Sequence, residues 1–173
     1  MAARPMKTLL AIATVGVVGL AAWCEYRPGD TRSAIADPTT GDTLPVTIAG
    51  RKYKLELALD DISRYRGLSD RREIAADGGM LFAFRRAKPL SFVMRKCLVP
   101  IDLIYLDAEG RVGRMYEMQV EPYDTPDDEL KDYESVEPAQ FAIELKAGSI
   151  DKLQLKRGQK IDLPLDALKK RAQ

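Results

Sequence analysis

Hydrophobic and polar positions alternate regularly near residue 50 of the chain. In residues 52–59 every second side chain is apolar, and most of the side chains between them are charged. Successive side chains of a strand point to opposite faces, so this spacing predicts a strand with one buried face. Residues 44–50 alternate in the same way, and Gly50-Arg51 between the two segments predicts a β-hairpin.

The segment 101–107 has a different pattern, because nearly all of its side chains are apolar. In a strand, three of them (Ile101, Leu103, Tyr105) lie on one face and three (Asp102, Ile104, Leu106) on the other. Both faces are then largely apolar, which predicts an interior strand covered on both sides. Asp102 must therefore be paired, hydrogen-bonded or protonated, because burying a bare carboxylate is too costly.

Further short apolar runs predict strands at residues 80–84, 111–118, 141–145 and 160–163. Two short helices are expected. The first starts after the N-cap pair Asp60-Asp61 and ends at Gly67, and the second is a helical turn at residues 149–155. Residues 119–140 form a long polar connection. The pattern predicts a mainly β fold with minor α, either a small β-barrel or a two-sheet sandwich of about eight short strands.

The N-terminal residues 1–24 have the pattern of a secretory signal. Arg4 and Lys7 precede an apolar run from residue 8 to residue 23. Cleavage after a small-x-small motif, lipidation at Cys24 and retention as a membrane anchor all remain open at this stage. We therefore expect the protein to be exported to the periplasm or another extracytoplasmic site, with membrane attachment through this segment as one form of it.

The rest of the chain divides by composition. Residues 25–42 are rich in Pro, Gly, Thr and Asp and predict a linker. Residues 43–165 form the β-rich domain, and residues 166–173 are expected to be a polar tail.

Composition narrows the chemistry. The chain has 173 residues, a formal net charge of +1, no histidine and two cysteines. Without histidine, Ser-His-Asp catalysis, Cys-His catalysis and histidine metal sites are excluded. Two cysteines cannot form a four-cysteine zinc site. The small net charge gives no field that would attract nucleic acid, so we expect no nucleic-acid partner, and we expect no cofactor and no metal.

The charges are unevenly distributed along the domain. Residues 51–96 contain 12 Lys and Arg against 6 Asp and Glu, whereas residues 97–145 contain 3 against 13. Within the second half, residues 121–137 contain 8 acidic residues and only Lys131. This acidic segment is interpreted as a solvated loop or as one that folds over the basic half. A calcium-binding loop is disfavoured, because the fixed spacing of such loops is missing.

Five segments together resemble the DUF192 family of prokaryotic proteins. They are residues 65–68, 79–84, 91–94, 100–107 with Gly110, and 143–148. The resemblance covers roughly residues 44–164. It implies a small β-rich domain, with an export signal in many members, and it brings no activity. The chain departs from the family pattern at Val93, where Trp is usual, and at Arg95-Lys96-Cys97, where Lys-Asn-Thr is usual.

Asp102 is the leading candidate for a ligand-binding residue. In this hypothesis it lies at the floor of a pocket, with Arg66, Met94 and Arg95 at the rim. In the structural alternative, Asp102 accepts backbone N–H hydrogen bonds from the turn near Pro100. Cys97 lies beside two cations that would lower its thiol pKa, but we expect it to act as a small buried apolar side chain.

Three functional classes follow from these residues. The favoured class is a non-catalytic binding or accessory module of the cell envelope, whose partner is a small molecule or an envelope protein. The second is a carboxylate-dependent hydrolase that uses Asp102 with another acid, such as Glu117 or Glu144. The third is a protein-interaction domain without a small-molecule pocket.

Overall fold

The computed structural model describes residues 42–173. The predicted signal segment, Cys24 and residues 25–41 of the predicted linker lie outside the described residues. Within the described part, no helix is long and apolar enough to span a membrane.

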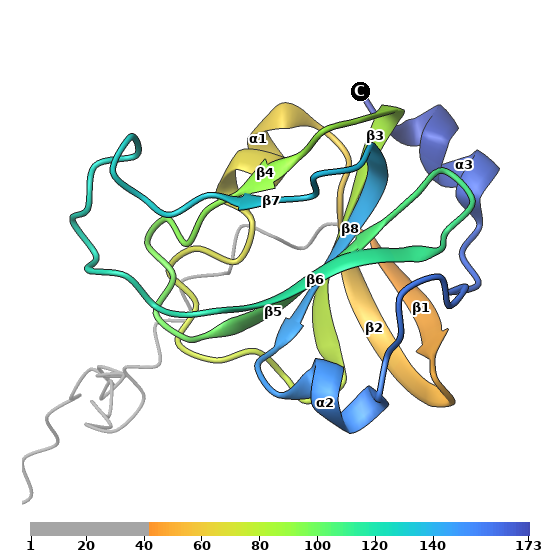
Figure 1. The fold of residues 1–173 in the computed structure, drawn as a ribbon, viewed down its shortest axis with the longest axis horizontal. Helices are drawn as coiled ribbons and strands as arrows, with labels where there is room; N and C mark the ends of the chain where they lie inside the picture. Colours follow the sequence, from red (N-terminus) through yellow and green to blue (C-terminus); the bar gives the residue numbers. More distant parts are fainter. Residues whose placement is uncertain (1–41) are drawn as a thin grey trace, which may run out of the picture. The chain divides into compact units, whose positions relative to one another are not determined.

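The described region consists of eight strands and three short helices (Figure 1). The strands are β1 (Thr43–Ile48), β2 (Arg51–Ala58), β3 (Gly78–Lys88), β4 (Ser91–Phe92), β5 (Ile101–Leu106), β6 (Val112–Met118), β7 (Tyr133–Glu134) and β8 (Ala139–Lys146). The helices are α1 (Asp61–Arg66), α2 (Ser149–Leu153) and α3 (Leu165–Arg171). Six strands form a mixed sheet in the order β1-β2-β3-β8-β5-β6, and β4 pairs with β7 in a small second sheet.

The main sheet is open, so the expectation of a closed barrel is wrong. Its edge strands are β1 and β6, which do not pair with each other in the described part of the chain. The start of β6 is instead hydrogen-bonded to residues 158–161, including a bond from the Val112 N–H to the Gln159 carbonyl. This later segment therefore lies along the outer edge of β6 at the start of the strand. The two-sheet description fits only loosely, because each strand of the second sheet has two residues.

Apolar side chains cover both faces of the main sheet. One cluster includes Ile104 and Leu106 and packs against buried residues of α2 and α3. The other includes Ile101, Leu103 and Tyr105 and packs beneath the β4–β7 pair. All six residues of β5 are buried, which confirms the predicted interior strand and the assignment of its faces.

The local patterns predicted the hairpin and the first helix correctly. β1 and β2 pair antiparallel, with Ala49 and Gly50 at the turn, both at positive φ. The turn is one residue earlier than the predicted Gly50-Arg51, and Arg51 is the first residue of β2. The carboxylate of Asp60 caps α1 by accepting a hydrogen bond from the Ser63 N–H, and Gly67 ends the helix. This hairpin and helix place α1 at the crossover between β2 and β3, which are the parallel pair of the sheet.

Three segments differ from the sequence-based expectation. Within the predicted strand at residues 160–163, only Lys160 forms a bridge, to Arg111. The connection at residues 119–140 contains the short strand β7, whose Tyr133 is buried. Most of the expected polar tail forms α3, because Leu168 is buried against the sheet.

Candidate functional site

A groove of about 350 Å³ lies between α1, β3 and β4. Its apolar lining is dominated by the rings of Phe82, Phe84 and Phe92. Its polar lining includes Arg66, Arg95 and Glu144. The residues come from segments far apart in the chain, and the parallel pairing of β2 with β3 brings the end of α1 over the sheet.

Glu144 is a buried carboxyl group in this groove. It lies on β8, opposite Met80 of β3 and Leu103 of β5, and only 5% of the residue is exposed. Burial raises its pKa from 4.5 to about 8, although the positive charge of Arg71 acts in the opposite direction. Its Oε2 atom is buried without a hydrogen-bond partner. Buried polar atoms are normally hydrogen-bonded, and the described residues provide no donor or acceptor for this oxygen.

Gly67 lies close to the Glu144 carboxyl group and, having no side chain, leaves the space beside that group open. A Cβ atom at position 67 would lie 3.6 Å from Phe82 Cζ and 3.8 Å from Glu144 Oε2. The residue has a φ of +49°, which favours glycine, because it ends α1. The helix end therefore passes directly over the carboxyl group without placing a side chain on it.

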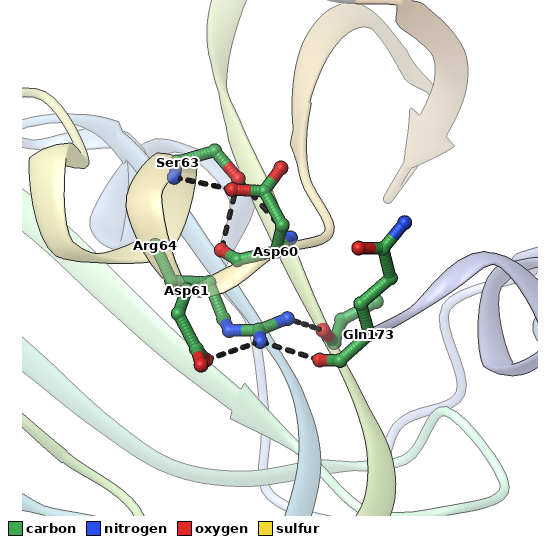
Figure 2. Close-up of polar contacts among 6 residues, drawn as sticks. Asp60, Asp61, Ser63, Arg64 and Gln173 are labelled. Atoms are coloured by element: carbon green, nitrogen blue, oxygen red, sulfur yellow. Dashed lines mark hydrogen bonds and ion pairs between the residues drawn. The ribbon is translucent and has the colours of Figure 1, made fainter.

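Arg64 holds α1 in position as one wall of the groove. As Figure 2 shows, its guanidinium donates a hydrogen bond to Asp61 and another to the main-chain oxygen of Gln173. A third bond, of 2.9 Å, goes to the carbonyl of Ala83 in β3. The guanidinium also lies over the Phe84 ring, 5.0 Å from its centroid. No residue of α1 is buried, so these contacts fix the helix where apolar packing does not.

Two arginines lie at the rim of the groove. Arg95 is paired with a carboxylate, and Arg66 is not paired with any described carboxylate. Arg95 stacks on the Tyr65 ring at 4.0 Å and forms an ion pair of 2.7 Å with Asp127. Arg95 is also the main cause that lowers the pKa of Asp127. Arg66 is exposed and forms no ion pair with any described carboxylate. The Arg95–Asp127 pair confirms that part of the acidic segment folds over the basic half.

The predicted site residues are divided between two faces of the sheet. Arg66 and Arg95 both line the groove. Met94 is 1% exposed and belongs to the apolar cluster on the same face. Asp102 is fully buried on the opposite face, where its Oδ2 accepts a hydrogen bond of 2.7 Å from the Ile150 N–H. Asp102 therefore does not line the groove.

The two acids considered as partners of Asp102 also differ in position. Asp102 lies opposite Leu145 in β8, so the adjacent Glu144 points to the other face of the sheet. Glu117 lies opposite Asp102 in β6 and is exposed, whereas Asp102 is buried. The structure thus brings Glu144 together with Arg66 and Arg95, and not with Asp102.

The sequence contained the signal for Glu144. In residues 141–145, alternation puts Phe141, Ile143 and Leu145 on one face and Ala142 and Glu144 on the other. The argument that singled out Asp102, a carboxylate within an apolar strand, applies equally to Glu144. The roles of Gly67 and Phe92 in the groove had no comparable local signal.

Cys97 lies at the edge of the groove and is a buried free thiol. Burial raises its pKa to about 12, and the negative charge of Glu144 acts in the same direction, whereas Arg95 lowers it. Burial of the thiol therefore favours a small buried apolar side chain over a cation-activated thiol. Within residues 42–173, no cluster of three or more acidic or cysteine side chains is arranged to hold a metal ion.

Comparisons with known proteins support the family resemblance. A family model described as "Uncharacterized ACR, COG1430" matches residues 44–163. A candidate transcription regulator from Sinorhizobium meliloti 1021 is 30% identical, with a TM-score of 0.57, over 69% of this chain and 90% of its own. A protein of unknown function from Novosphingobium aromaticivorans DSM 12444 is 24% identical and has the same fold, with a TM-score of 0.63 over 73% and 89%. No curated protein matches the sequence.

Proposed function

Since this chain belongs to the DUF192 family, whose description names no activity, we propose that it is a non-catalytic binding module of the cell envelope. Its ligand occupies the groove between α1, β3 and β4. The observation that carries this proposal is that Glu144, whose buried Oε2 has no hydrogen-bond partner, lines the groove, whereas Asp102, whose buried Oδ1 also has no partner, does not. A buried carboxyl oxygen without a partner destabilises the free protein, and a ligand that supplies the missing partner removes that cost.

The groove has the size and lining of a small-molecule site. Its volume of about 350 Å³ falls at the lower end of the range for such sites, which combine apolar walls with a few polar groups. Four of the five segments that resemble the family contribute to its lining, namely those with Arg66, Phe82, Phe92 and Glu144. These segments are distant in sequence and meet at the groove.

Binding is favoured over hydrolysis by the arrangement of the carboxylates. A hydrolase of the carboxylate type needs two acids close together with separated pKa values. Asp102 and Glu144 point to opposite faces of the sheet. Glu117 lies opposite Asp102 in β6, but neither of these two acids lines the groove. The groove also contains Asp61, whose side chain is fully exposed and paired with Arg64. None of these acids forms a close pair with Glu144 of the kind that hydrolysis requires.

The cellular location is proposed from residues 1–24. Their basic start and apolar run support export, with the domain either released or held at the membrane by this segment. A binding module in that position would meet small molecules or proteins of the envelope.

The binding site is tested by a fragment screen on the full-length, ¹⁵N-labelled protein. The library contains neutral, acidic and basic fragments, and the readout is the amide shifts of Gly67 and Phe92. We expect hits that move these amides, and we expect Glu144→Leu to weaken them. Glu117→Leu is the matched control, because Glu117 is an exposed glutamate on β6 outside the groove. Hits that are scattered over the surface, or unaffected by Glu144→Leu, would contradict the proposal.

A further inference from the structure

We propose that the ligand of this groove is a small organic anion with an apolar body. Its charged group lies at Arg66, and its body lies on the partly exposed ring of Phe92, which packs against Phe82. A hydrogen-bond acceptor on the same molecule receives a bond from the carboxyl group of Glu144. This inference rests on the proposed function and specifies the chemistry of the ligand.

The sign of the ligand's charge follows from the arginines that line the groove. Arg64 is occupied by hydrogen bonds to Asp61, Ala83 and Gln173. Arg95 is paired with Asp127. Arg66 alone among these three has no carboxylate partner within the described residues and is exposed at the rim. An anion gains a partner there, whereas a cation would be repelled by the charge of Arg66, which no described carboxylate compensates.

The apolar body of the ligand is inferred from the aromatic side chains that line the groove. Phe82 and Phe92 pack edge to face, with their ring centroids 4.8 Å apart. Phe82 is 1% exposed, and Phe92 is partly exposed to the groove. An aromatic or aliphatic body placed on the exposed part of the Phe92 ring is removed from water, which favours binding in proportion to the apolar area buried.

The hydrogen-bond acceptor on the ligand is inferred from the protonation state of the Glu144 carboxyl group. Because burial raises its pKa to about 8, the carboxyl group is mostly protonated at pH 7 and can donate a hydrogen bond from its unpartnered oxygen. The ionisable groups that act on it or that it acts on are Arg71, Cys97 and Tyr105. Burial raises the pKa of Cys97 to about 12 and also raises that of Tyr105, so neither titrates near pH 8. Ionised Glu144 would repel an anion, and binding should weaken above pH 8.

Three probes of similar shape test the charge preference. Benzoate, benzyl alcohol and benzylamine are titrated into the full-length protein, and binding is followed by ligand-observed NMR at pH 7. We expect benzoate to bind most tightly and benzylamine most weakly. Arg66→Gln should weaken benzoate about tenfold, the size of one charge-assisted hydrogen bond. Arg111→Gln, an exposed arginine outside the groove, should leave benzoate binding unchanged.

The role of Glu144 is tested by titrations at pH 7 and pH 9 with 4-acetylbenzoate, whose ketone oxygen supplies the second acceptor that benzoate lacks. Wild-type affinity for this probe should fall by up to about tenfold between pH 7 and pH 9, because the protonated fraction of Glu144 falls about tenfold across its pKa of about 8. Glu144→Gln keeps a neutral hydrogen-bond donor and should bind 4-acetylbenzoate equally at both pH values. An unchanged wild-type affinity at pH 9 would overturn the role given to Glu144.

The outcomes separate this inference from the proposed function. If benzylamine binds as tightly as benzoate, or if Arg66→Gln behaves like Arg111→Gln, the anion inference fails and the groove remains a binding site. If none of the probes, and no fragment of the wider library, binds at the groove, both proposals fail.

Discussion

Asp102 Oδ2 accepts a hydrogen bond of 2.7 Å from the backbone N–H of Ile150, 48 positions later in the chain. The bond joins β5 to the first turn of α2. The residue at the N-cap position of this helix, Gly148, offers no side-chain cap, so a carboxylate from a neighbouring strand takes that role. The structural alternative expected Asp102 to accept a backbone N–H hydrogen bond, and it does. The donor, however, is Ile150 of α2 and not a residue of the turn near Pro100.

Replacing Asp102 should reduce stability. Asp102→Asn keeps the size of the side chain but loses the charge-assisted hydrogen bond, and we expect the free energy of unfolding to fall by about 1–3 kcal/mol. Chemical denaturation at pH 7 measures this change. Glu117→Gln on the neighbouring strand is the control, and it should change stability by less than about 0.5 kcal/mol, because Glu117 is exposed. An unchanged or raised stability for Asp102→Asn would return Asp102 to the candidate ligand-binding residues.

Glu144 should make stability depend on pH. Its pKa is about 8 in the folded protein, against an ordinary value of 4.5. Between these values the unfolded chain releases a proton that the folded protein keeps, so the free energy of unfolding falls as pH rises from 4.5 to about 8 and then levels off. With about 1.4 kcal/mol per pKa unit, the loss is on the order of several kcal/mol. Denaturation curves across this range should show the fall for wild type and a smaller one for Glu144→Gln.

Core truncations should be costly on the face beneath the groove. Leu103 and Phe82 are 0% and 1% exposed. We expect Leu103→Ala and Phe82→Ala each to reduce the free energy of unfolding by about 2–5 kcal/mol. Ile62→Ala serves as the control, since Ile62 is 76% exposed and should lose less than about 0.5 kcal/mol. Losses below about 0.5 kcal/mol at both buried positions would mean that the core is assigned wrongly.

Cys97 should be unreactive in the folded protein. Burial raises its thiol pKa to about 12, so the thiolate population at pH 8 is very small. In a Cys24→Ser variant, a chromogenic disulfide reagent should react slowly at Cys97 under native conditions and rapidly in denaturant. Fast native labelling would show that the site opens readily or that the thiol is activated.

The N-terminal segment should direct the protein to the envelope. Fractionation of cells that express the full chain is expected to place it outside the cytoplasm. Deletion of residues 1–24 should leave the protein in the cytoplasm, with a circular dichroism spectrum typical of a mainly β fold. Recovery of the intact full-length chain in the cytoplasm would refute the export hypothesis.

The sequence by itself determined the features whose causes lie within a few neighbouring residues. The hairpin of β1 and β2 follows from period-two alternation and a turn that accepts positive φ. The helix α1 follows from Asp60 at its start and Gly67 at its end. The covered faces of β5 follow from its uninterrupted apolar pattern. The family resemblance was also visible in the sequence, and the family model confirms it.

Only the tertiary structure decided which residues from distant segments of the chain lie together at the groove. The pairing of β3 with β8 puts Glu144 beside Phe82, and the crossover through α1 carries Arg66 to the same groove. Local alternation says that Asp102 and Glu144 are each buried, but strand register decides that they lie on opposite faces. The helix α3 forms because Leu168 packs against the sheet, although the tail itself is largely polar. These contacts join residues distant in the chain, and they are set by strand order and packing, which no short window of sequence contains.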